Sequence, residues 1–147
     1  MAEVSRYVID ASVVAKWHLK DEEHAEIAAR VFDDLQLGHI DLLAPYHLKY
    51  EVGSSILKAS RRQRLTPSEA LRSLELSAYW GIHLVNGLHL EGFQVAQRLG
   101  CGYYDAIYLA LADVSDMAFL SADDKLRVTV SNRFRHFLWI QDYKSPL

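Results

Sequence analysis

Four acidic residues stand at points in the sequence from which their carboxylates could act together. Asp10 follows directly on a short apolar run, and Asp123 follows the apolar segment MAFLSA. Glu51 comes six residues after Pro45, and Asp105 stands in the first turn of the helical pattern YYDAIYLALA. In an open parallel α/β sheet, functional groups gather beyond the carboxyl ends of the strands. We therefore expect all four carboxylates at one edge of one sheet.

A shared site of this kind predicts a metal ion. Two like charges about 4 Å apart repel each other by about 4 kcal/mol at a surface-like dielectric. A divalent cation would offset that repulsion, and ligands that are all oxygen suit Mg²⁺ or Mn²⁺. Such a cation attracts phosphate and lowers the pKa of a bound water. The expected reaction is hydrolysis of a phosphodiester.

Each acid also has a simpler explanation when it is taken alone. Asp10, Asp105 and Asp123 stand at or near helix starts, where a carboxylate accepts backbone N–H groups and complements the helix dipole. Glu51 lies about 60° from Leu48 around its helix, at the margin of the apolar stripe, where a solvated glutamate is ordinary. Their common placement is what favours a shared site.

The elements that must position these acids alternate along the chain. Apolar runs predict strands at 7–10, 40–45, 82–86, 117–122 and 136–142. Helical spacing predicts helices at 21–38, 47–63, 66–80, 90–100, 103–115 and 123–132. Thr66, Pro67 and Glu69 form a capping-box pattern. The alternation predicts an α/β fold with a parallel sheet covered on both faces.

Composition narrows the class of protein. The 147 residues, half of them apolar, are expected to form a single domain over 1–147. A net charge of −3 argues against a passive, high-affinity nucleic-acid module. There is no apolar run long enough for a membrane span and no signal-peptide pattern. Cys101 is the single cysteine, which predicts a reducing, cytoplasmic location.

The joint pattern VIDAS…P-x5-E…YYDAIYLALA…LSADDKL resembles the PIN domain, and within it the VapC-type toxins of toxin–antitoxin pairs. The resemblance implies a three-layer α/β/α sandwich with a central parallel sheet of about five strands. Asp10, Glu51, Asp105 and Asp123 match the acidic quartet that holds Mg²⁺ or Mn²⁺ for endoribonuclease cleavage. Ser12 matches a small hydroxyl position that supports the first aspartate, and Ser121 stands where threonine is more usual.

The same resemblance implies partners. The expected substrate is RNA, often tRNA or ribosomal RNA, and the expected partners are a second copy of the chain and a cognate antitoxin protein. Asp124, beside Asp123, is either a further ligand or simply a helix start. Asp113 falls where family members often carry an acid, and it is assigned no role.

Basic and aromatic residues supply candidates for RNA contact. A basic cluster at a helix end is usually a solvated face that complements the helix dipole, and phosphate contact is the alternative. Tyr103, Tyr104 and Trp17 could stack on unpaired bases, with core packing as the alternative. His47, four residues before Glu51, could be a side contact of the site. The basic candidates are Lys16, Lys58, Arg61, Arg62 and Arg64.

Other functions remain open at this stage. A PIN-like fold without catalysis would be an RNA-binding or protein-binding module, but the presence of all four acids favours the enzyme. A phosphotransfer domain would require a second acid near the first strand end, where Ser12 stands instead. A flap-type DNA nuclease usually has more acids and a longer chain.

Overall fold

The computed structural model describes residues 3–146 and has the predicted α/β architecture. Five strands form one sheet in the order β3-β2-β1-β4-β5, and every neighbouring pair is parallel. This confirms the expected PIN-like sheet. The strands are β1 (Ser5–Ile9), β2 (Ile40–Pro45), β3 (His83–Val85), β4 (Ala118–Ser121) and β5 (Phe137–Trp139).

Helices connect the strands. Among the described residues, none of them has both the length and the apolar character needed to cross a bilayer. The α-helices are α1 (Ala11–Val14), α2 (Ala25–Gln36), α3 (Leu48–Arg61), α4 (Pro67–Glu75), α5 (His89–Leu99), α6 (Tyr103–Ser115) and α7 (Asp124–Val130). Three 3₁₀ turns complete the chain: η1 (Ala15–Trp17), η2 (Leu76–Tyr79) and η3 (Ile140–Asp142).

Helix ends follow the expected local chemistry in some places and depart from it in others. The capping box is confirmed: Thr66 Oγ1 accepts from the Glu69 N–H, and Glu69 Oε2 accepts from the Thr66 N–H. α2 begins at Ala25 rather than at residue 21, because His24 has a left-handed φ of 64°. The short helix α1, directly after Asp10, was not predicted.

The strand order places a reversal between β1 and β4. From the central β1, the chain builds outward through β2 and β3 on one side and through β4 and β5 on the other. Helices that leave such a point in opposite directions open a crevice beyond the strand ends, and ligands bind there in open α/β sheets. The reversal therefore fixes where a functional site is expected.

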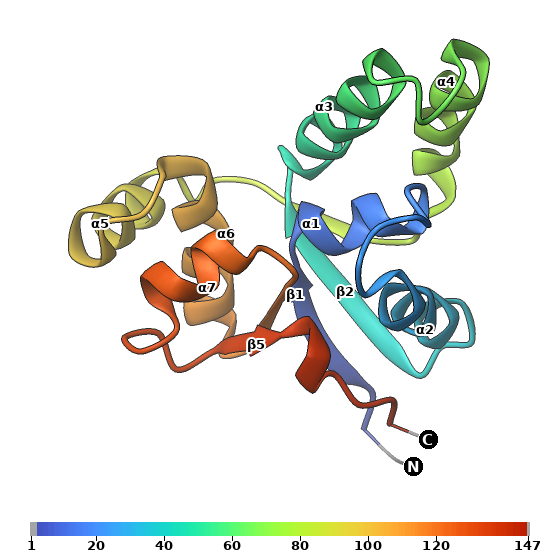
Figure 1. Ribbon diagram of the computed structural model, residues 1–147. Coiled ribbons are helices and arrows are strands. Elements are labelled where there is room, and N and C mark those ends of the chain that lie inside the picture. The colour runs from blue at the N-terminus through green and yellow to red at the C-terminus, as the bar shows by residue number, and fades with distance from the viewer. Residues whose placement is uncertain (1–2, 147) are drawn as a thin grey trace.

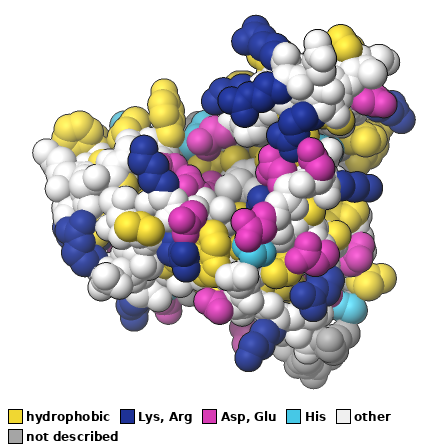
Figure 2. Space-filling model, viewed as in Figure 1, with side chains coloured by type: hydrophobic (Ala, Val, Ile, Leu, Met, Phe, Trp, Pro, Cys, Tyr) yellow, Lys and Arg dark blue, Asp and Glu magenta, His cyan; other side chains and the backbone are white. Residues whose placement is uncertain are grey.

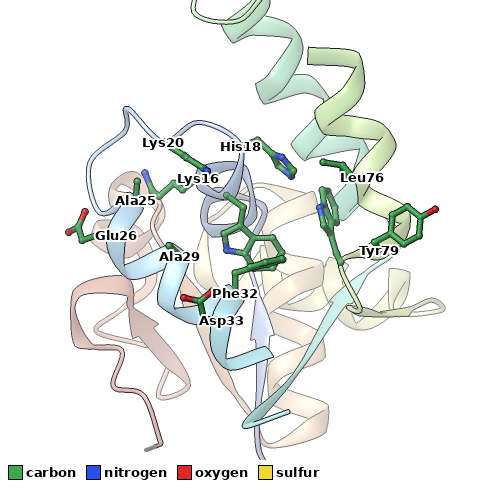
Figure 3. A pocket seen from close by; sticks show the side chains of 12 residues that line it. Lys16, His18, Lys20, Ala25, Glu26, Ala29, Phe32, Asp33, Leu76 and Tyr79 are labelled. Carbon is green, nitrogen blue, oxygen red and sulfur yellow. The ribbon is translucent and has the colours of Figure 1, made fainter. Parts of the chain in front are cut away.

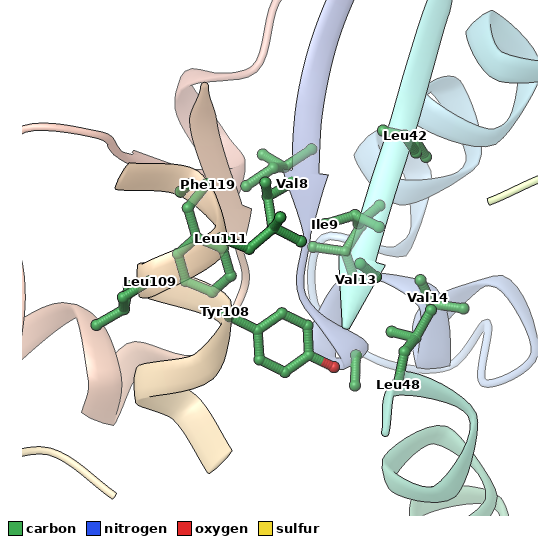
Figure 4. Packing of buried hydrophobic residues seen from close by; sticks show 14 of the residues in the cluster. Val8, Ile9, Val13, Val14, Leu42, Leu48, Tyr108, Leu109, Leu111 and Phe119 are labelled. Carbon is green, nitrogen blue, oxygen red and sulfur yellow. The ribbon is translucent and has the colours of Figure 1, made fainter. Parts of the chain in front are cut away.

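The layers pack on either side of this sheet. α6 contacts β1, β2 and β4 on one face, whereas α2 lies on the opposite face against β2 (Figure 1). α3 and α4 pack together and project beyond the sheet. Fully buried side chains from β1, β2, β4 and α6 meet in the core, among them Val8, Leu42, Phe119 and Tyr108 (Figure 4).

A buried carboxylate ties the C-terminal segment to α2. Asp34 Oδ2 accepts from the Tyr143 hydroxyl, and Asp34 Oδ1 accepts from Ser145 Oγ at 2.9 Å. Burial alone would raise the pKa of Asp34, but these hydrogen bonds and one with His39 outweigh it and hold the pKa below its ordinary value. The charged form of Asp34 is therefore satisfied, and Tyr143 and Ser145 are held against α2.

The close contact of α5 with α6 generates a prediction. A Cβ atom at Gly92 would lie 2.7 Å from Ile107 Cγ1 and 3.3 Å from Ile107 Cα. Because backbone as well as side chain blocks it, Gly92→Ala is expected to push the helices apart and to lower the free energy of unfolding by about 1–3 kcal/mol. Urea denaturation measures this.

The matched control is Gly53→Ala in α3, where a Cβ atom would meet Leu74 at an ordinary 3.6 Å. We expect that variant to be neutral or more stable by about 0.5–1 kcal/mol, because alanine favours the helix. Equal losses in both variants would contradict the steric explanation.

Candidate active site

Asp10 lies at the strand reversal. It follows the last residue of β1, and its N–H donates to the Leu120 carbonyl of β4 at 3.0 Å. Its side chain makes no capping hydrogen bond to α1, so the capping interpretation is wrong for this residue. Asp10 is only 5% exposed. The carboxylate is therefore held in the crevice and is not used to begin a helix.

Two serine hydroxyls hold one oxygen of this carboxylate. Ser12 Oγ and Ser121 Oγ each donate to Asp10 Oδ2 at 2.8 Å. Each hydroxyl in turn accepts a backbone N–H, from Ala122 at 2.9 Å and from Asp123 at 3.1 Å respectively. A hydroxyl has one hydrogen, so these N–H groups direct both hydrogens to Asp10. Within the described residues Oδ1 accepts no hydrogen bond, which leaves it available to a ligand.

Asp123 and Asp105 approach from α7 and α6. Asp123 Oδ1 caps α7 by accepting the Leu126 N–H at 3.0 Å, so the capping interpretation of Asp123 is confirmed. Asp105 stands in the first turn of α6. Burial raises its pKa, and the charge of Asp123 raises it further. The two carboxylates are thus near enough to act on each other.

Glu51 enters from the first turn of α3. Its side chain is 35% exposed, and its Oε1 lies 3.3 Å from Nε2 of His47. The same Nε2 makes a 3.1 Å hydrogen bond with the Tyr104 carbonyl. Glu51 Oε1 is itself buried and has no hydrogen-bond partner among the described residues. A carboxylate left in this state is a candidate metal ligand.

The electrostatics link the four acids. Burial raises the pKa of Asp10 to about 6 against the two serine hydrogen bonds, and the charges of Asp105 and Asp123 add to the increase. Burial also raises the pKa of Glu51 to about 7, and the charges of the other three acids add to it. Within residues 3–146, none of the four forms an ion pair with lysine or arginine. No lysine or arginine among the described residues therefore neutralises this repulsion.

The donor set fits a hard divalent cation, although it does not form a closed cage. In the part of the chain that the structure describes, no three acidic, histidine or cysteine side chains are placed so that they could hold a metal ion together. Mg²⁺ keeps several waters and is commonly bound by one or two carboxylates. The free Oδ1 of Asp10 and the carboxylate of Glu51, which accepts no well-formed hydrogen bond at Oε1, suit such an open site.

Comparison with known proteins identifies the fold family. The family model for the PIN domain matches residues 7–130. The chain belongs to the PIN domain family. It is 29% identical over 127 residues to Ribonuclease VapC3 of Pyrobaculum aerophilum, covering 82% of this chain and 92% of that protein. The crystal structure of PAE2754 from Pyrobaculum aerophilum superposes with a TM-score of 0.67 at 20% identity, over 95% of this chain and 93% of that one.

The basic candidates of this PIN domain divide into two groups. Arg64 Nη2 pairs with Asp21 at 2.6 Å and with Glu22 at 3.2 Å, and Lys16 pairs with Glu22 at 3.4 Å. The charges of Arg64 and Lys16 are therefore paired with acidic side chains of the protein itself. The other three are exposed near the end of α3 and form no ion pair among the described residues, and Figure 2 shows lysine and arginine side chains gathered there. They are Lys58, Arg61 and Arg62.

Asp124 and Trp17 both have partners other than the four acids. Asp124 pairs with Arg127 one turn along α7, with 68% of its side chain exposed. Trp17 Nε1 donates to the Ala28 carbonyl at 2.9 Å, and its ring packs edge-on against Phe32 with centroids 5.0 Å apart. Trp17 therefore packs between elements, whereas Tyr104 stays 63% exposed.

The PIN domain also has a hollow that lies apart from the four carboxylates. It has a volume of about 730 Å³ and is formed by η1, α2 and η2 (Figure 3). Phe32, Tyr79 and Trp80 contribute aromatic surface, and Lys16 and Lys20 contribute charge. None of the four acids lines it. Its chemistry is thus separate from that of the quartet.

Sequence reasoning missed Tyr108, although it lies beside the site. It belongs to the apolar stretch of α6, three residues after Asp105, and its apolar neighbours predict a core residue. Its ring is indeed packed against Phe119, with centroids 5.7 Å apart. Only its hydroxyl departs from that role. A tyrosine within an otherwise aliphatic and alanine-rich run was the one signal that could have found it.

The buried state of Asp10 predicts how stability depends on pH. In the folded protein the pKa of Asp10, about 6, exceeds its ordinary value of 3.8. The protonated Asp10 carboxyl is favoured by the folded state. Its contribution to the free energy of unfolding is therefore greatest below pH 4 and is lost as pH rises through 6. Asp10→Asn removes this titration, so the free energy of unfolding of the metal-free native protein should fall relative to the variant by about 2 kcal/mol between pH 4 and pH 8.

Urea denaturation in the presence of a chelator, at several pH values for both proteins, measures this difference. The comparison with Asp10→Asn cancels the histidines and other groups that titrate equally in both. Parallel stability curves would show that Asp10 ionises as freely in the folded protein as in the unfolded chain.

Proposed function

We propose that this PIN domain is a metal-dependent endoribonuclease and the toxin of a VapC-type toxin–antitoxin pair. The observation that supports this most is the arrangement of Asp10, Glu51, Asp105 and Asp123 at the strand reversal. The charges of the three aspartates raise the pKa of Glu51, and none of the four acids is paired with lysine or arginine within the described residues. Similarity to a protein named as a VapC ribonuclease supports the same reaction and substrate class.

The four acids would hold Mg²⁺ or Mn²⁺, and each is held in place by different contacts. Asp10, fixed on one oxygen by Ser12 and Ser121, presents its other oxygen without reorganising. Asp123 is fixed by its cap on α7, and Asp105 by the first turn of α6. The cation, when bound, supplies Lewis acidity toward the scissile phosphate and the attacking water. The four residues themselves orient the cation and create a negatively charged site. That site repels phosphate unless a cation is bound.

The substrate and partners follow from the same proposal. RNA would reach the pocket along the exposed lysine and arginines at the end of α3, which can contact phosphates. The exposed Tyr104 beside Asp105 offers a face on which an unpaired base can stack. A tRNA or ribosomal RNA target, a homodimer, a cognate antitoxin and a cytoplasmic location stay predictions of the family resemblance.

The alternative is a PIN-like module that binds RNA or protein without catalysis. The burial of Asp10 argues against it. A carboxylate whose pKa is raised to about 6 destabilises the fold at neutral pH. A protein that only binds a partner gains nothing from keeping that charge, whereas a metal-dependent enzyme requires it.

Substitution of the acids tests the reaction. Asp10→Asn and Asp105→Asn keep the side-chain shape and remove one ligand charge each, so we expect both to abolish metal-dependent RNA cleavage and leave the fold intact. Cleavage of labelled RNA with Mn²⁺, together with circular dichroism, measures both properties. Cleavage that survives in a folded variant would contradict the assignment.

Glu51→Gln tests metal binding separately from cleavage. It should weaken Mn²⁺ binding measured by calorimetry, because a neutral amide replaces a carboxylate ligand. An unchanged isotherm would remove Glu51 from the site.

The two basic groups predict different effects of substitution. Replacing Lys58, Arg61 and Arg62 with alanine should weaken RNA binding and flatten its dependence on salt, because fewer counterions are released. Fluorescence anisotropy of labelled RNA at several salt concentrations measures both. Arg64→Ala is the matched control: it should lower stability and leave the salt dependence unchanged, because its charge is paired with Asp21 and Glu22. The reverse result would locate the RNA path elsewhere.

A further inference from the structure

The Tyr108 hydroxyl is a buried polar group that the fold leaves unsatisfied. Tyr108 is 0% exposed, and its hydroxyl has no hydrogen-bond partner within the described residues. A buried polar group without a partner costs free energy, and most native structures avoid it. Phenylalanine would fill the same space without that cost. The hydroxyl therefore requires a reason outside core packing.

Its surroundings point to the acidic site. Tyr108 belongs to α6, and its hydroxyl points toward the place where β1 passes into α1 (Figure 4). The hydroxyl lies close enough to the Glu51 carboxyl to lower the pKa of that group as a hydrogen-bond donor does. The geometry of this contact still leaves Tyr108 Oη and Glu51 Oε1 without a well-formed hydrogen bond in residues 3–146.

His47 connects the same two side chains. Its ring packs edge-on against the Tyr108 ring with centroids 4.9 Å apart, and its Nε2 lies 3.3 Å from Glu51 Oε1. The His47 ring is also hydrogen-bonded to the Tyr104 carbonyl, so it limits how far the Glu51 side chain can move. A small rotation of the Glu51 carboxylate would be enough to bring it into a hydrogen bond with the Tyr108 hydroxyl.

We propose that Tyr108 is a positioning residue for Glu51: its hydroxyl donates to one carboxylate oxygen and turns the other toward the metal. The inference rests on the proposed function. Tyr108 would then do for Glu51 what Ser12 and Ser121 do for Asp10, where hydroxyl donors occupy one oxygen and leave its neighbour free. Such outer hydrogen bonds orient metal ligands, and their loss commonly weakens metal affinity 10–100-fold.

The hydroxyl keeps the hydrogen that this role requires. Burial raises the pKa of Tyr108, and the charges of Asp10 and Glu51 raise it further. The phenol therefore keeps its hydrogen at neutral pH and can donate it. A carboxyl oxygen of Glu51 can accept that hydrogen, and both oxygens can act as acceptors once the group is ionised.

Tyr108→Phe removes the hydroxyl alone and tests the proposal. Calorimetry with Mn²⁺ should give a dissociation constant at least tenfold higher than that of the wild type. The melting temperature of the metal-free protein should be unchanged or higher, because an unsatisfied hydroxyl is lost. In a Glu51→Gln background, Tyr108→Phe should cause no further loss of Mn²⁺ affinity, since residues that act through one another are not additive.

Tyr143→Phe is the matched control, because it removes a buried hydroxyl that does have a partner, Asp34. It should lower the melting temperature and leave Mn²⁺ affinity unchanged. The two phenylalanine variants thus predict opposite patterns, which a general effect of losing a buried hydroxyl cannot produce.

The outcomes separate this inference from the proposed function. If wild type and Tyr108→Phe bind Mn²⁺ equally well, the positioning role is wrong and the metal site stands. If the metal-free Tyr108→Phe protein melts lower or fails to fold, the hydroxyl serves the core and the proposal is overturned. If the wild type binds no Mn²⁺, both the metal site and the role of Tyr108 are wrong.

Discussion

The burial of a carboxylate at the reversal of the strand order is the constraint on which the rest of this structure depends. Asp10 is almost completely removed from water, and the nearby acids repel its charge. The protein answers with hydroxyl and N–H donors rather than with a lysine or an arginine. Neutral donors fix the carboxylate in direction but leave its negative charge uncancelled. That combination keeps the site oriented and open to an external cation.

Much of this arrangement could be predicted from the order of residue types. Apolar runs followed by an acid identified Asp10 and Asp123, because strand ends in a parallel sheet share one edge. The helix that carries Asp105 was found at its observed bounds. Those features depend on residues that are close together in the sequence, so the sequence alone is enough to predict them. The quartet as metal ligands stays a prediction.

The rest depended on contacts between distant segments. Arg64 looked like one member of a basic cluster, but it pairs across the fold with Asp21 and Glu22. Trp17 looked available for stacking, but it packs against α2. The start of α2 was placed too early, since the left-handed His24 follows no strong sequence signal. The roles of Arg64 and Trp17 are decided by contacts with other elements, whereas the start of α2 is decided by the backbone conformation of a single residue.

The distance between Asp10 and its donor has a consequence for synthesis of the chain. Ser121 stands 111 residues after Asp10. A ribosome must release the chain as far as β4 before that strand can pair with β1, so the carboxylate stays solvated and unoriented until then. A nascent chain that ends before β4 therefore lacks the Ser121 hydroxyl that orients Asp10.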